Sequence, residues 1–71
     1  MIPPEQLRTV KPGDLIYHAT GKWEVLVNDE ANERMIVTQL EPAEGTYTYQ
    51  QLESLEGGSI VHGPVAVRKY K

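Results

Sequence analysis

Short stretches with alternating apolar and polar residues predict β-strands along most of this chain. From residue 23 onward, Trp23, Val25 and Val27 share one face by the period of two, and the other face is mostly polar. Residues 34–40 are rich in β-branched side chains and carry apolar groups on both faces, which indicates a strand inside a sheet. The predicted strands cover residues 15–18, 23–28, 34–40 and 46–48, followed by two pieces of a last strand at residues 60–62 and 65–69.

Polar segments between these strands predict turns. Pro12 and Gly13 suit the two central positions of a type II turn over residues 11–14, because proline presets φ and glycine accepts a positive φ. Residues 29–33 and 41–45 are polar and acidic, and we expect them to form loops between strands. The chain is therefore divided into closely spaced strands without a linker.

Two short helices are predicted. Prolines at the start of residues 3–8 favour one helical turn, which places Leu7 at one end of the core. Thr48 and Gln51 have the spacing of a capping box, which predicts a two-turn helix that ends at residues 57–58. The residues expected on its inward face are Tyr49, Leu52 and Leu55.

Five short strands with one short helix before the last strand predict an all-β fold. A small sheet of this kind buries its apolar face by bending strongly and closing on itself. A chain of 71 residues is long enough for one domain, so we expect a single domain over residues 1–71.

Two motifs carry a resemblance to a known class of small barrels. Residues 10–16 read VKPGDLI and residues 23–25 read WEV. The first resembles the hydrophobic-x-x-Gly-Asp-x-hydrophobic turn of SH3-like barrels, including SH3 and Tudor-like domains, and the second is similar to the strand that follows it there. The resemblance covers residues 10–27 and implies a five-stranded SH3-like barrel. Lys22 stands where peptide-binding SH3 domains carry a ligand-stacking tryptophan, so the resemblance does not imply polyproline binding.

The composition limits the cellular environment and the classes of partner that we expect for this chain. The net charge of −3 disfavours nucleic-acid binding, which depends on neutralising phosphates. There is no cysteine, no apolar run long enough to cross a bilayer and no signal-peptide pattern, so we expect a cytoplasmic protein that is not bound to a membrane.

No catalytic motif stands out in the sequence. Ser54 and Ser59 lack the setting of a nucleophile, and the spacing of His18 and His62 matches no metal motif. The glycine pair at residues 57–58 lacks the continuation of a phosphate-binding loop. We therefore expect no enzymatic activity, no metal and no cofactor.

The leading interpretation is a protein-interaction module. Tyr17 and Tyr47 flank predicted turns and are expected to be exposed, whereas Trp23 and Tyr49 are expected in the core. The aromatic residues also suggest a cage for a methylated cation, as in Tudor-like barrels. Acidic loops would steer the chain toward a partner with a basic surface. The candidate partner-binding residues are Tyr17, Lys22, Trp23, Tyr47, Glu30, Glu33 and Glu44.

Two alternatives stay open at this point. Basic residues near both ends of the chain could meet in space and bind nucleic acid; they are Arg8, Lys11, Arg68, Lys69 and Lys71. Alternatively, the last strand, which ends in residues 65–71, could pair along its edge with a second copy or a larger assembly, so the chain would be a structural subunit. Either a monomer or a weak homodimer is compatible with the composition.

Overall fold

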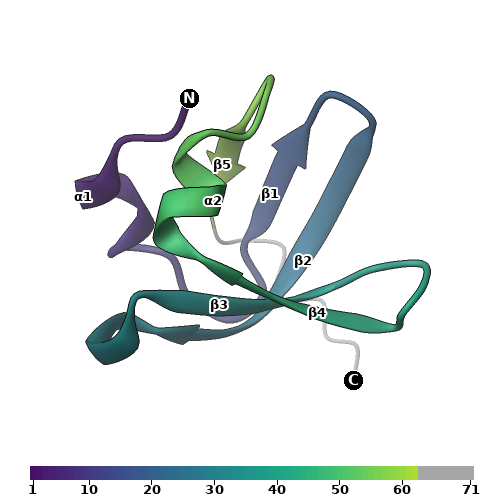
Figure 1. Cartoon of the computed structure of the whole chain (residues 1–71), viewed down its shortest axis with the longest axis horizontal. Helices are drawn as coiled ribbons and strands as arrows, with labels where there is room; N and C mark the ends of the chain where they lie inside the picture. The colour runs from purple at the N-terminus through teal and green to yellow at the C-terminus, as the bar shows by residue number, and fades with distance from the viewer. Residues whose placement is uncertain (63–71) are drawn as a thin grey trace.

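Five antiparallel strands form one sheet in the computed structural model, which describes residues 1–62 (Figure 1). The strands are β1 (Leu15–His18), β2 (Gly21–Asp29), β3 (Arg34–Thr38), β4 (Glu44–Thr48) and β5 (Ser59–Val61). They lie in the order β4-β3-β2-β1-β5. The helical elements are α1 (Pro4–Leu7), the short 3-10 helix η1 (Glu30–Asn32) and α2 (Tyr49–Glu53).

The sheet is bent at β2, which belongs to both of its halves. The first part of β2 pairs with β1, and the second part pairs with β3 after a shift of register between Val25 and Val27. Figure 1 shows β1 and β5 rising away from the plane of β3 and β4. The extra residue at this bulge turns Val27 outward, where it is 45% exposed, so the prediction that it shares the inward face of Val25 is wrong.

The two edges of the sheet are β4 and β5. No ladder joins these edges within residues 1–62, so the confirmed fold is a bent five-stranded antiparallel sheet with a short helix before the last strand. The predicted strand piece at residues 65–69 lies outside the described residues, as do Arg68, Lys69 and Lys71.

The predicted turn before β1 is confirmed. The Asp14 N–H donates to the Lys11 carbonyl at 3.0 Å, and Gly13 has a φ of 97°, which glycine adopts without a Cβ clash. The turn is tied to β2, because the Gly13 N–H donates to the Val25 carbonyl at 2.8 Å. These bonds fix the point at which the chain enters the sheet.

The core lies between the concave side of the sheet and the two short helices. The capping box of α2 is present: the Thr48 hydroxyl accepts from the Gln51 N–H, and the Gln51 side chain accepts from the Thr48 N–H. The helix ends at Glu53, earlier than predicted, and the glycines at 57–58 belong to the turn before β5. The buried apolar residues are Ile2, Leu7, Val10, Ile16, Val25, Met35, Val37, Tyr49 and Leu52.

Tyr49 makes the stability of this core sensitive to alkaline pH. Burial raises the pKa of the Tyr49 phenol above its ordinary value of 10.0. Because the folded state holds this proton more tightly than the unfolded state, the corresponding stability is complete below pH 10 and is lost as the pH rises through the folded-state pKa. We expect the urea midpoint to fall above pH 10 in the wild type and to fall less in Tyr49→Phe. An equal alkaline decline in both proteins would contradict this assignment.

Candidate functional site

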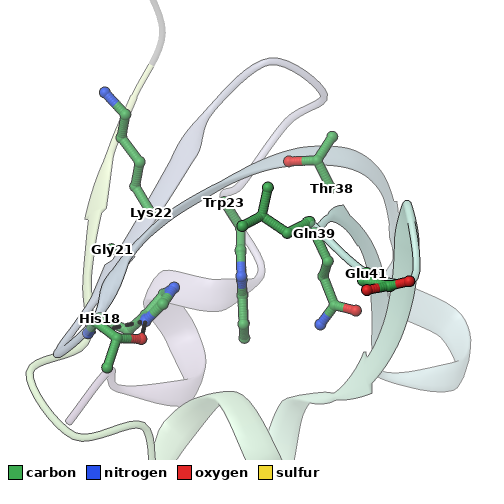
Figure 2. A pocket seen from close by; sticks show the side chains of 9 residues that line it. His18, Gly21, Lys22, Trp23, Thr38, Gln39 and Glu41 are labelled. Carbon is green, nitrogen blue, oxygen red and sulfur yellow. Dashed lines mark hydrogen bonds between the residues drawn. The ribbon is translucent and has the colours of Figure 1, made fainter.

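An open pocket of about 610 Å³ lies at one end of the sheet (Figure 2). His18 and Trp23 line it from the β1–β2 hairpin, and Gln39, Leu40 and Glu41 line it from the β3–β4 loop. The first and third connections of an antiparallel meander lie at the same end of a sheet, which brings these distant segments together.

Three rings pack against one another at this pocket. The Trp23 ring stacks on Tyr47, with ring centres 4.8 Å apart and planes 17° apart, and His18 lies 4.4 Å from Trp23 at 45°. His18 belongs to β1 and Tyr47 to β4, so rings from two different strands pack against the indole. A methylated cation needs rings around a vacant centre, and these rings contact each other instead. Trp23 therefore offers its edge to a ligand.

Two ring N–H groups at the pocket have no hydrogen-bond partner among residues 1–62. The His18 Nδ1 accepts from the Thr20 N–H at 3.3 Å, so Nε2 carries the proton in the neutral ring. That Nε2 is buried without a hydrogen bond, and Figure 2 shows it on the side of the ring toward Trp23. The indole N–H of Trp23 also donates to no other residue within the part of the chain that the structure describes. The pocket can thus supply at least the indole donor to a carbonyl or carboxylate oxygen.

The pocket also has an acidic and an apolar wall. Glu41 carries a carboxylate there, and Leu40 is 100% exposed. The sequence pattern predicts Leu40 inside a strand, but β3 ends at Thr38 and the Gln39 N–H closes a loop by donating to the Ala43 carbonyl at 2.9 Å. The Gln39 side-chain amide donates to the Tyr47 hydroxyl, which holds the loop against the stacked rings.

The two candidate tyrosines lie on opposite faces of the sheet. Tyr17 follows the fully buried Ile16 in β1, so it points outward, and it is exposed as predicted. Tyr47 lies directly opposite the buried Met35, so it points inward and is only partly exposed. Tyr17 and Tyr47 therefore cannot form one contact surface.

Lys22 belongs with Tyr17 rather than with the stacked rings. Its Nζ atom lies 5.9 Å from the centre of the Tyr17 ring, and Figure 2 shows its side chain extending away from Trp23. Trp23 itself is partly buried and packs against the core, in agreement with the sequence-based expectation. Of the predicted partner-binding residues, Trp23 and Tyr47 are brought together, and Lys22 lies at the rim.

The predicted acidic surface is divided between the two ends of β3. Glu30 and Glu33 lie before this strand and Glu44 lies after the next loop, so the strand separates them. Glu33 is engaged in an ion pair with Arg8, whose guanidinium also lies 5.4 Å from the centre of the Tyr49 ring. The acidic residues do not form one patch.

The alternative basic corner is not assembled in the described part of the chain. Arg8 is engaged by Glu33 and Tyr49, and Lys11 is the remaining described member of the set. Because a phosphate would have to compete with the Glu33 carboxylate for Arg8, the geometry gives no support to nucleic-acid binding at this corner.

Among the pocket residues that were not predicted site residues are His18, Gln39 and Leu40, whereas Glu41 belongs to the acidic loop over residues 41–45 that was expected to face a partner. A local signal was absent, since each is an ordinary polar or apolar residue near a strand end. The signal that could have found them is topological, because the predicted hairpins already place residues 18–23 and 38–41 at the same end of the sheet.

No helix within residues 1–62 is long and apolar enough to cross a membrane. No group of three or more histidine, aspartate or glutamate side chains in that range could hold a metal ion. Comparisons of the chain with protein-family models, with curated proteins and with solved structures find no match.

Proposed function

We propose that this chain is a non-enzymatic protein-interaction module of the SH3-like barrel class that binds its partner at the pocket beside Trp23. The strand order, the bent second strand shared by both halves and the helix before β5 support the barrel class. The observation that carries the binding proposal is the fully exposed Leu40 beside a ring wall with an unpaired indole N–H.

The chemistry of the pocket fits a polypeptide. An apolar side chain of the partner contacts Leu40 and the indole edge, while a partner carbonyl accepts from the indole N–H. The acidic net charge and Glu41 on the pocket wall favour a partner with basic residues next to that apolar side chain.

Trp23 is the single tryptophan, so its fluorescence reports directly on the pocket. Peptides selected from a displayed random library against the folded protein should change the Trp23 emission on titration. Leu40→Ser should weaken their binding by about tenfold, which corresponds to about 1.4 kcal/mol for a central apolar contact. The substitution should not alter stability, because the side chain is fully exposed.

Val61→Ser is the matched control. Val61 is 43% exposed on β5 and pairs with Leu15, at the opposite end of β1 from the pocket residue His18, so the substitution removes a comparable apolar side chain away from the pocket. Selected peptides should bind this variant as they bind the wild type. Peptides that bind without changing Trp23 emission, or that lose equal affinity in both variants, would contradict the proposal.

A further inference from the structure

The outer edge of β4 is a second binding surface candidate. Within residues 1–62, β4 is the last strand at one side of the sheet, and β3 is its one neighbouring strand there (Figure 1). Glu44, Thr46 and Thr48 are exposed along it. The edge contains no proline, no lysine and no bulge, which are the features that usually protect a strand edge from pairing.

The hydrogen bonds at both ends of the hairpin show which backbone groups face this edge. The Gln39 N–H donates to the Ala43 carbonyl, and the Tyr49 N–H donates to the Glu33 carbonyl at 2.7 Å. In an antiparallel ladder, pairs that exchange hydrogen bonds alternate with pairs that do not. The register between β3 and β4 is continuous from one end of the hairpin to the other, so the backbone N–H and carbonyl groups of Gly45 and Tyr47 form the hydrogen bonds to β3. The backbone groups of Glu44, Thr46 and Thr48 therefore point away from it.

Thr48 provides an independent check of this alternation. Its N–H donates to the Gln51 side chain at 2.8 Å, in the capping box of α2, which requires it to point away from β3. The N–H and carbonyl groups of Glu44 and Thr46 have no such partner among residues 1–62. Two donors and two acceptors thus stand in a row along the edge, at the spacing that an added strand needs.

The charge of the β4 edge indicates which kind of partner strand could pair with it. Glu44 is the one charged side chain in β4, and the chain as a whole carries a net charge of −3. A second copy would bring like charges together, whereas a lysine or arginine opposite Glu44 would be attracted to it. We propose that the β4 edge binds an extended, basic segment of a partner protein, which adds to the sheet as a sixth strand. This inference does not depend on the Trp23 pocket.

The test uses a synthetic seven-residue peptide that alternates lysine and valine, titrated into the isotope-labelled full chain. The amide resonances of Glu44 and Thr46 should shift more than those of the β5 residues Ser59 and Ile60. Thr46→Pro removes an outward N–H that the β3 ladder does not use, and it should weaken binding by about tenfold or more. Thr46→Val keeps that N–H and should bind as the wild type does.

Two measurements keep the test informative where Thr46→Pro fails to fold. The same peptide with alternate backbone nitrogens methylated should not bind the wild type, and a peptide that alternates glutamate and valine should also fail to bind.

Glu44→Gln should weaken binding of the lysine peptide, and Leu40→Ser should leave that binding unchanged, which distinguishes this edge from the pocket. Equal binding of the methylated peptide, shifts centred on Trp23, or a dimer of the chain alone that Thr46→Pro dissociates would overturn the proposal.

Discussion

Replacing Asn28 with alanine should lower the free energy of unfolding by about 2–4 kcal/mol, because it leaves three partly buried polar groups without hydrogen-bond partners. The Asn28 Nδ2 donates to the carbonyls of Leu7 at 3.0 Å and Val10 at 2.9 Å. Its Oδ1 accepts from the Tyr49 hydroxyl at 2.6 Å. One amide therefore connects the end of α1, strand β2 and helix α2.

The size of this effect follows from what is left behind. Alanine leaves two carbonyls and one hydroxyl without partners in a partly buried position, and each such group costs about 1–3 kcal/mol, with some recovery by water. Tyr49→Phe removes one of the three bonds together with its donor, so it should cost about 1 kcal/mol. For a domain this small, a loss of about 3 kcal/mol is a large share of the total stability.

Urea denaturation followed by circular dichroism measures the difference. Asn32→Ala is the matched control, since Asn32 is an exposed asparagine that bonds to Asp29 within its own loop. We expect that control to remain within about 1 kcal/mol of the wild type. A loss in Asn28→Ala no larger than the loss in Asn32→Ala would mean that the three bonds contribute little.

Local signals account for the parts of the fold that the sequence predicts. The turn over residues 11–14 and the capping box at Thr48 depend on residues close in sequence, and both form as predicted. The inward direction of Asn28 depends instead on the bulge between Val25 and Val27. No local sequence feature indicates that bulge, because the alternation of Trp23, Val25 and Val27 is uninterrupted.

The candidate site shows the same contrast between features that depend on neighbouring residues and features that depend on distant ones. Exposure of Tyr17 follows from its position beside a turn, and the structure agrees. The inward direction of Tyr47 depends on its pairing with Met35 across β3, and flanking residues do not reveal that register. The β-branched run before Leu40 predicts a strand that includes it, whereas the bond from the Gln39 N–H to the Ala43 carbonyl closes a loop before Leu40.

Replacing Asp14 with alanine should have the second largest effect, a loss of about 2–3 kcal/mol for a buried carboxylate with charge-assisted hydrogen bonds. Asp14 is 3% exposed. Its Oδ2 accepts from the Lys11 N–H at 2.9 Å and lies 2.8 Å from the His62 Nδ1, whose N–H donates to it. The carboxylate thus connects the turn before β1 to the end of β5.

The backbone hydrogen bonds of Asp14 explain why its replacement should also destabilise the neighbouring strand β2. The Asp14 carbonyl accepts from the Val25 N–H at 2.8 Å, at the point where β2 bends, so a loosened turn also disturbs the central strand. His62→Ala removes one partner at a half-exposed position that water can fill, and it should cost about 1 kcal/mol. Asp14→Asn keeps an acceptor oxygen and should fall between the two. Urea midpoints at constant pH measure all three variants, and equal losses in Asp14→Ala and His62→Ala would show that the turn does not depend on this carboxylate.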